Sequence, residues 1–183
     1  MSPLAFLHTA LRHFQTTGSV APSSRYLCRH IVASAQLTPD SRVLEVGPGN
    51  GVITRHYLPH LSDPAQATLV EINPVFCGIL RRDPALRGAH VIGAGVETLP
   101  ADSLEPAADV IISSVPFYSL PPSVREDISQ QYARLLRPGQ LWVQYTYSPN
   151  PGFFRRQPGF HLVSSHLVLR NVPPARVLVL RRT

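Results

Sequence analysis

The stretch VLEVGPGNG, residues 43–51, decides the fold that we predict for this chain. An apolar strand, with the acid Glu45 inside it, runs directly into three alternate glycines. Gly47, Gly49 and Gly51 allow the backbone to approach a ligand closely, and they precede a helix whose N-terminus faces that ligand. The stretch therefore predicts a ligand site at the end of the first strand of a sheet.

Apolar strands alternate with helices along the chain after this stretch. We expect strands at residues 42–46, 67–72, 90–94, 109–115 and 140–147, with helices at residues 51–61, from Pro74 onward, after residue 94 and at residues 123–136. This alternation is typical of an α/β fold with a doubly wound, mainly parallel sheet. The last two apolar runs, residues 161–170 and 175–182, are separated by only NVPP, which predicts a closing hairpin with at least one antiparallel strand.

Length and composition bound the possibilities. With 183 residues and 44% hydrophobic residues, the chain is large enough for one domain with a sizeable core. No apolar run approaches the roughly 20 residues of a membrane span, and His8, Arg12 and His13 interrupt the segment where a signal peptide would lie. Cys28 and Cys77 lack metal-ligand spacing, so we expect reduced core thiols in a cytoplasmic protein without a metal site.

The charge is distributed unevenly along the chain. The formal net charge is +6, and every basic residue other than His is Arg. Residues 1–42 carry a net charge of +3, residues 43–150 carry −3 and residues 151–183 carry +6. Basic ends around a mildly acidic middle indicate an anionic partner such as lipid phosphate or nucleic acid. A high Arg usage that reflects only genome composition is the alternative.

The ligand class follows from two acids and the glycine spacing. A doubly wound sheet binds ligands at the carboxyl ends of its strands, where Glu71 can accept hydrogen bonds from ribose hydroxyls. A dinucleotide and S-adenosylmethionine both fit up to this point. The glycines follow GxGxG rather than GxGxxG, since Val52 stands where the last glycine would be. Glu45 beside the turn suits a cationic sulfonium better than a pyrophosphate.

The motifs VLEVGPGNG and LVEIN resemble the motif pair of class I S-adenosylmethionine-dependent methyltransferases. The resemblance covers about residues 40–183. It implies a Rossmann-like sheet of order 3-2-1-4-5-7-6 with the seventh strand antiparallel, as the closing hairpin would provide. The alternative is that the glycines only make a tight turn.

The resemblance also implies roles for individual residues. The three glycines would hold the methionine and ribose parts of S-adenosylmethionine. Glu71, with Ile72 beside it, would bind the ribose hydroxyls, and Glu45 would organise the glycine loop from behind.

One position departs from the family pattern. Related enzymes commonly have an Asp after the third strand that faces the adenine amino group, whereas this chain has Ala94 or Gly95 there. We therefore expect the adenine contact from the backbone around Gly95 and Val96. Glu97 is a further candidate for that contact.

The stretch SSVPFYSLP, residues 113–121, directly follows the fourth strand. In methyltransferases that act on amines, a polar residue, a spacer, Pro and an aromatic lie here beside the transferable methyl group. The adenine dimethylases have Asn-x-Pro-aromatic, whereas this chain has Ser114, Val115, Pro116 and Phe117. The absence of Asn weakens the case for adenine as the acceptor, and Ser114 is also expected to contact the cofactor.

Three further stretches are similar to bacterial phospholipid N-methyltransferases, and rRNA adenine dimethylases are more distant relatives. They are GSVAPSSRYL (18–27), WVQYTYSP (142–149) and LRNVPPARVLVLRR (169–182). The resemblance then spans nearly the whole chain. It implies docking on the inner face of the membrane and stepwise methylation of phosphatidylethanolamine toward phosphatidylcholine.

The N-terminal residues are expected to form two helices. Residues 3–16 place Leu4, Phe6, Leu7, Ala10, Leu11 and Phe14 on one helical face and basic groups on the other. Such a helix suits a membrane interface, or it packs on the sheet. Ser23 or Ser24 can cap a second helix that runs to about Leu37. Residues 1–40 would cap the substrate or dock on the membrane, and residues 41–183 would form the core of a single domain.

Aromatic side chains are expected to hold the increasingly methylated amine by cation–π contacts. We expect these to be Tyr26, Phe117, Tyr118 and Tyr147, with Tyr145 as a further candidate; core packing is the alternative for each. Arg25 would meet the lipid phosphate or form a surface salt bridge. PGFFRRQPGF, residues 151–160, would be a second membrane contact or an ordinary loop. No His–Asp pair suggests a base, so catalysis would rest on positioning and on desolvation of the amine.

Two other functions stay open. The chain would be a methyltransferase of another substrate class, either RNA adenine or a small-molecule amine. It would otherwise be a non-catalytic binding module on the same fold, since the acid after the third strand is missing. The absence of Asn before Val115 and of a C-terminal helical RNA domain argues against RNA.

Overall fold

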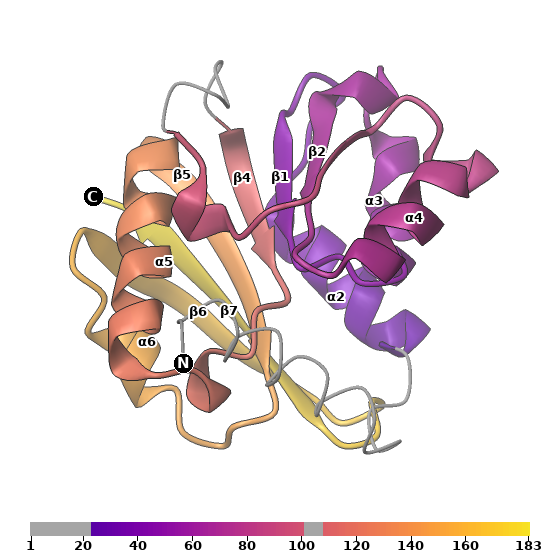
Figure 1. The fold of residues 1–183 in the computed structure, drawn as a ribbon. Coiled ribbons are helices and arrows are strands. Elements are labelled where there is room, and N and C mark those ends of the chain that lie inside the picture. The colour runs from indigo at the N-terminus through magenta and orange to yellow at the C-terminus, as the bar shows by residue number, and fades with distance from the viewer. Residues whose placement is uncertain (1–22, 101–107) are drawn as a thin grey trace.

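The computed structural model describes residues 23–100 and 108–183 of this chain (Figure 1). The amphipathic helix expected over residues 3–16 lies outside the described residues. Within them, a central sheet is flanked by helices on both faces (Figure 1). The doubly wound α/β fold predicted from the alternating pattern is confirmed.

In the described part of the chain, seven strands form one sheet in the order β3-β2-β1-β4-β5-β7-β6. Their bounds are β1 Val43–Val46, β2 Ala67–Val70, β3 His90–Ile92, β4 Ala108–Ser113, β5 Leu136–Thr146, β6 Phe160–Val168 and β7 Ala175–Arg182. The first five strands run parallel, whereas β7 is antiparallel to both β5 and β6. The expected order and the antiparallel closing hairpin are therefore confirmed.

Two of the helices begin at residues whose side chains cap them. The bounds of the helices are α2 Arg25–Ala35, α3 Val52–Tyr57, α4 Pro74–Arg82, α5 Pro122–Leu135 and α6 Gly152–Arg155, and the 3-10 turns include η1 Leu58–His60, η4 Val96–Thr98 and η6 Phe117–Ser119. The Ser24 side chain accepts a hydrogen bond from the Leu27 backbone N–H and so caps α2. Asn73 caps α4 in the same way, with Pro74 at the first helical position.

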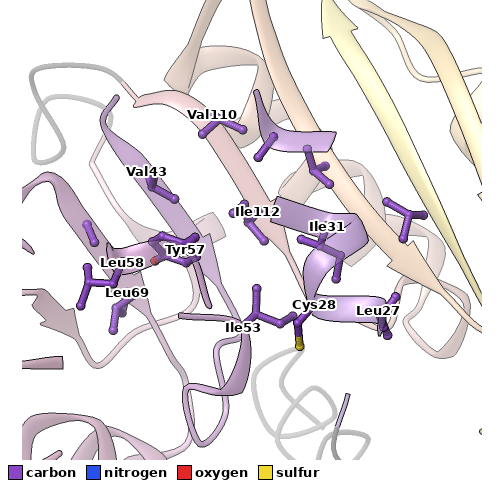
Figure 2. Close-up of a cluster of buried hydrophobic side chains, with 14 of the residues drawn as sticks. Leu27, Cys28, Ile31, Val43, Ile53, Tyr57, Leu58, Leu69, Val110 and Ile112 are labelled. Atoms are coloured by element: carbon purple, nitrogen blue, oxygen red, sulfur yellow. The ribbon is translucent and has the colours of Figure 1, made fainter. Parts of the chain in front are cut away.

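Two apolar cores hold the sheet between these helices. On one face, α2 and α3 pack on the central strands through buried side chains such as Leu27, Ile31 and Ile53 (Figure 2). On the other face, α5 and α6 cover Trp142 and its aromatic neighbours. Fully burying a side chain of this size stabilises the fold by about 1.5–3 kcal/mol. The cores therefore keep the carboxyl ends of the parallel strands in fixed positions.

Several element boundaries differ from those expected. β2 ends at Val70 and β4 at Ser113, because the chain turns away from the sheet after the next residue in each case. β5 begins at Leu136, before the RPG stretch, and its register with β4 shifts there. The helix expected to reach residue 61 ends at Tyr57 and continues as η1, because Pro59 has no N–H to donate.

The stretch 151–160 was expected to be a loop, either a second membrane contact or an ordinary loop, and the assignment as a loop is corrected. Its first part forms α6, and Phe154 is only 1% exposed in the core beneath α5. The ring of Phe153 packs against Phe154 at 5.0 Å between centroids. These aromatic rings stabilise the fold and leave little apolar surface for a membrane contact.

Candidate active site

A cavity of about 480 Å³ opens at the carboxyl ends of the parallel strands. Its lining comes from the segments that follow β1, β2, β4 and β5, together with η4 and Ser23, just before α2. Small-molecule sites have volumes of about 300–1,000 Å³. The cavity also lies where doubly wound sheets bind ligands, so it is the candidate active site.

The structure brings together most of the residues predicted for the site. Those that line the cavity are Gly47, Gly49, Glu71, Ile72, Gly95, Val96, Ser114, Pro116, Tyr118 and Tyr147, and the further candidates Glu97 and Tyr145 join them. The predicted residues that do not line it are Tyr26, Glu45, Gly51 and Phe117.

Two glycines of the loop after β1, Gly49 and Gly51, are required for different physical reasons. Gly49 has a φ of +58°, and a Cβ atom there would meet nothing within 4 Å, so the loop leaves room for a ligand to approach its backbone. At Gly51, with a φ of +78°, a Cβ atom would lie 2.8 Å from Leu86 Cδ1 and 3.0 Å from Leu80 Cδ2. Gly51 therefore serves the packing at the start of α3, and it does not line the cavity.

Glu71 presents a buried carboxylate whose orientation is fixed by the backbone. Its Oε2 accepts the Gly49 N–H at 3.0 Å, and its Oε1 accepts the Asn73 N–H at 2.8 Å. Burial raises the pKa of this carboxyl, and the backbone N–H groups lower it. Each oxygen keeps acceptor capacity toward the cavity. This arrangement fits the two neighbouring hydroxyls of a ribose.

Glu45 lies behind the glycine loop, outside the cavity. It is fully buried, and its Oε2 accepts the Thr54 hydroxyl at 2.6 Å, which ties β1 to α3. Burial raises the pKa of Glu45 to about 7, although the hydrogen bond from Thr54 lowers it. Glu45 therefore holds the first turn of the helix that follows the loop.

Glu97, in η4, occupies the space left by the missing side chain at position 95. A Cβ atom at Gly95 would clash with both carboxylate oxygens of Glu97. Glu97 Oε2 is buried and makes no hydrogen bond to any residue that the structure describes. Burial raises the pKa of this carboxyl. An unpartnered buried oxygen on a cavity wall is an acceptor available to a ligand.

Tyr145 and Tyr147 together form one part of the cavity wall. They alternate along the end of β5 and its extension, so both side chains point to the same side, and their rings meet edge-on at 5.9 Å between centroids. Desolvation raises the pKa of Tyr145 to about 12 and also raises that of Tyr147. Both are therefore neutral phenols at pH 7 and cannot act there as tyrosinate bases.

Phe117, expected beside the amine, lies in the core, which corrects that expectation. It is 2% exposed, and its ring contacts those of Tyr132, Trp142 and Phe154. The turn η6 directs two adjacent aromatic side chains differently, and Tyr118 is the one that reaches the cavity. The Tyr118 hydroxyl donates to the backbone carbonyl of residue 150.

Tyr26 also lies outside the cavity, which corrects its expected contact with the amine. Its half-buried ring stands in the first turn of α2, beside the guanidinium groups of Arg25 and Arg170. Sequence reasoning missed Ser23 and Phe76 as lining residues. Phe76 had a signal, because it lies in the first turn of the helix after Glu71, but the local sequence of Ser23 has none.

Among the described residues, no group of three or more His, Cys, Asp and Glu side chains is arranged to hold a metal ion. Of the helices that the structure describes, none has the length and apolar content needed to span a bilayer. Cys28 and Cys77 are free and buried, as predicted.

Known proteins resemble this chain in sequence. The family described as methyltransferase domain matches residues 43–139. The ornithine lipid N-methyltransferase of Singulisphaera acidiphila is 28% identical over 177 residues, which are 93% of this chain and 91% of that protein. The ribosomal RNA small subunit methyltransferase A of Thermosynechococcus vestitus is 44% identical over 59 residues, which are 32% of this chain and 21% of that protein.

Solved structures resemble it in fold. The N-methyltransferase NodS from Bradyrhizobium japonicum WM9 superposes with a TM-score of 0.69 at 15% identity, over 86% of this chain and 95% of that one. Its complex with S-adenosyl-L-homocysteine superposes with a TM-score of 0.65 at 14% identity, over 87% of this chain and 88% of that one. At such identities the likeness establishes the fold alone.

Proposed function

Since this chain belongs to the methyltransferase domain family, we propose that it methylates the amine of a membrane lipid, with phosphatidylethanolamine and its methylated forms as the expected acceptors. S-adenosylmethionine is its cofactor. When bound, this cofactor would supply an electrophilic methyl group on its sulfonium sulfur for transfer to the acceptor nitrogen, with S-adenosylhomocysteine as the leaving group. The observation that carries the proposal is that one cavity holds both the ribose-binding arrangement of Glu71 and a wall of paired tyrosines.

The loop after β1 and the segment after β2 would hold the cofactor. The backbone around Gly47 and Gly49 would accommodate its methionine and ribose parts, and the two oxygens of Glu71 would accept the ribose hydroxyls. Ile72 and Val96 also line this part of the cavity and would flank the adenine ring. All of these contacts use groups that the structure already orients.

Glu97 would take the role of the acid that the family has after its third strand. The unpartnered Oε2 can accept a hydrogen bond from the adenine amino group, while the small Gly95 leaves the space for its carboxylate. The contact thus comes from a side chain two residues further along the chain. The backbone around Gly95 and Val96 would supply the remaining adenine contacts.

The paired tyrosines would hold the acceptor amine. An ethanolamine ammonium resembles that of Lys, with a pKa of about 10.4, so its neutral form costs about 4–5 kcal/mol at pH 7. Desolvation in the cavity lowers the pKa of an amine by up to a few units. The rings of Tyr145 and Tyr147, neutral at pH 7, would offer cation–π contacts to each successively methylated nitrogen. Positioning beside Ser114 and Pro116 then supplies most of the catalysis.

Two observations favour a lipid over RNA adenine as the acceptor. The lipid-modifying relative aligns over 93% of this chain, whereas the ribosomal RNA relative aligns over 32%. Ser114 stands where adenine dimethylases have Asn, and the ring of Phe117 is buried, so it cannot stack on a base.

Methyl transfer to vesicles tests the proposal. Purified protein and S-adenosylmethionine with a labelled methyl group are mixed with vesicles of phosphatidylethanolamine and phosphatidylglycerol, or of phosphatidylglycerol alone. A third set contains an ornithine lipid in place of phosphatidylethanolamine. We expect labelled methylated lipid only where an amine lipid is present. The absence of labelled lipid in every set, from protein that binds S-adenosylhomocysteine tightly, would contradict the proposal and direct the search to ribosomal RNA.

Variants of the tyrosine wall sharpen this test. Replacing Tyr145 and Tyr147 together by Leu removes both π faces and is expected to lower the transfer rate about tenfold, since a desolvated cation–π contact contributes about 1–2 kcal/mol. The matched double replacement by Phe keeps the rings and is expected to retain most of the activity. Equal losses in the two double variants would argue against a cation–π role.

A further inference from the structure

The connection between β6 and β7, residues 169–174, lies at the end of the sheet where the parallel strands have their carboxyl ends and the cavity opens. β5 ends here, and the antiparallel β7 begins here (Figure 1). Asn171, which is 2% exposed, fixes the connection to the start of α2, because its Oδ1 accepts the Ser24 backbone N–H at 2.9 Å. The neighbouring Ser23 lines the cavity. The connection therefore borders the cavity mouth.

Large apolar side chains are concentrated on this connection and on the end of β6. Leu167, Leu169 and Val172 are 51%, 70% and 77% exposed. Of the seven exposed large hydrophobic side chains among the described residues, these three and Val163 lie within one stretch of ten residues. Single exposed apolar side chains are ordinary, but a cluster marks a surface that another apolar phase covers.

Two arginines border these apolar side chains. The guanidinium carbons of Arg25 and Arg170 lie 5.0 and 5.1 Å from the ring centroid of Tyr26. Neither forms a salt bridge with a carboxylate among the described residues. The sequence has no acid in residues 1–39 or 128–183. The surface therefore has positive charge without local neutralisation, which attracts an anionic partner.

We propose that this surface, which we call the hairpin tip and which consists of Arg25, Leu167, Leu169, Arg170 and Val172, docks the protein on an anionic phospholipid bilayer. The apolar side chains enter the interface, and the two guanidinium groups bind lipid phosphates. The inference rests on the proposed function, because a lipid acceptor has to reach the cavity from a bilayer.

The chemistry of the hairpin tip favours a bilayer over a nucleic acid. Arginines bind the phosphates of both partners, but Leu169 and Val172 gain free energy only where an apolar phase removes them from water. Binding of single-stranded nucleic acid uses aromatic rings on which bases stack. The ring of Tyr26 is instead already in contact with two guanidinium groups.

Docking at the hairpin tip would turn the cavity mouth toward the lipid headgroups. The tip is joined to the cavity wall by the buried Asn171, so the two keep a fixed relation. A headgroup amine could then reach Tyr145 and Tyr147 while its acyl chains stay in the bilayer. No long extraction of the lipid from the membrane is required.

Vesicle binding by the full chain tests this surface. Co-sedimentation is measured with vesicles of phosphatidylcholine alone and of phosphatidylcholine mixed with phosphatidylglycerol. The double variant L169S/V172S is expected to lose about tenfold or more in affinity for the mixed vesicles. The double variant R25Q/R170Q is expected to lose about fivefold per arginine at low salt. Val163→Ser, in β6 and outside the hairpin tip, replaces another exposed apolar side chain and is the control; it should bind within about twofold of the unchanged chain.

Activity on two forms of the lipid separates this inference from the proposed function. L169S/V172S should methylate lipid dispersed in detergent micelles within about twofold of the unchanged chain, and lipid in vesicles more slowly. If the unchanged chain methylates lipid but both double variants bind vesicles as it does, docking at the hairpin tip is overturned and the proposed function stands. If the unchanged chain methylates neither form, the proposed function itself fails.

A second copy of the chain is the alternative partner of the hairpin tip, and a further measurement detects it. The mass of the unchanged chain and of L169S/V172S in solution is measured by light scattering. A dimer that the double variant abolishes, together with unchanged vesicle binding, would make the hairpin tip a contact between copies. That result would also overturn the inference.

Discussion

The two acids that line the cavity, Glu71 and Glu97, are held in different ways. Both oxygens of Glu71 accept backbone N–H groups, whereas Oε2 of Glu97 has no partner among the described residues. A carboxylate fixed by backbone donors presents its remaining lone pairs in fixed directions. The orientation of Glu71 is therefore fixed before any ligand binds, and we propose that Glu97 gains its hydrogen bond from the bound ligand.

The variant Glu71→Gln tests the first of these acids. An amide places an N–H₂ group against the backbone N–H of either Gly49 or Asn73, so one buried donor loses its acceptor. Hydrogen bonds to charged groups contribute about 1.5–3 kcal/mol, so we expect affinity for S-adenosylhomocysteine to fall about tenfold to a hundredfold. Calorimetric titration measures it, with the exposed Glu126→Gln as the control. Equal affinities for both variants would remove Glu71 from the cofactor site.

The variant Glu97→Ala tests the second acid through its selectivity. If Glu97 accepts the adenine amino group, the unchanged chain should bind S-adenosylhomocysteine about tenfold more tightly than the analogue in which oxygen replaces that amino group. The variant should bind the two ligands with nearly equal affinity. A purely structural loss would weaken both ligands alike and keep their ratio. A preserved ratio in Glu97→Ala would therefore assign adenine recognition to the backbone instead.

At the scale of elements, one side chain joins α2 to the β6–β7 connection. Asn171 accepts the Ser24 backbone N–H and donates from Nδ2 to the Pro173 carbonyl at 2.7 Å. The first of these hydrogen bonds links residues 147 apart in the chain. It places the start of α2, directly after the cavity-lining Ser23, against the hairpin tip.

The variant Asn171→Ala should weaken this junction. It leaves a backbone donor and a backbone acceptor without their partner, and each such loss costs about 1–3 kcal/mol where the group stays buried. We expect the free energy of unfolding in urea to fall by about that amount. Gln130→Ala, at an exposed position of α5, should change it by about 0.5 kcal/mol or less. Similar losses for the two variants would mean that the junction does not stabilise the fold.

At the scale of the whole molecule, a buried acid makes stability depend on pH. Burial raises the pKa of Glu45 from its ordinary value of 4.5 to about 7 in the folded protein. The folded state therefore holds a proton that the unfolded state has released over this range. The stabilisation is complete below about pH 4.5 and is lost as the pH rises through about 7.

We expect the free energy of unfolding to fall by roughly 3 kcal/mol between about pH 5 and about pH 8 through this group. The pKa of Glu71 and that of Glu97 are also raised by burial and act in the same direction. Glu45→Gln keeps an acceptor for the Thr54 hydroxyl and cannot ionise, so its stability should fall less with pH. Urea unfolding at both pH values measures this. Parallel changes in the variant and the unchanged chain would contradict the assignment.

The sheet, and the position of the cavity at the carboxyl ends of its parallel strands, were predictable from local sequence. The period of the apolar residues marks strands and helices, and the glycines after residues 43–46 mark the turn at the first strand. The short NVPP connection leaves an antiparallel hairpin as the simple solution for the last two strands. Glu71 follows the second strand directly, so its place at the cavity also follows from chain order.

Only the tertiary structure decided which side chains near the carboxyl ends of the parallel strands reach the cavity. Phe117 and Tyr118 are adjacent aromatics, but the core beneath α5 and α6 accepts only the first of them. Glu97 turns back over Gly95 because that position has no side chain. The physical reason is the distance along the chain over which each property is determined. Backbone periodicity and turns depend on neighbouring residues. The direction of a side chain depends on packing against elements that are far away in sequence.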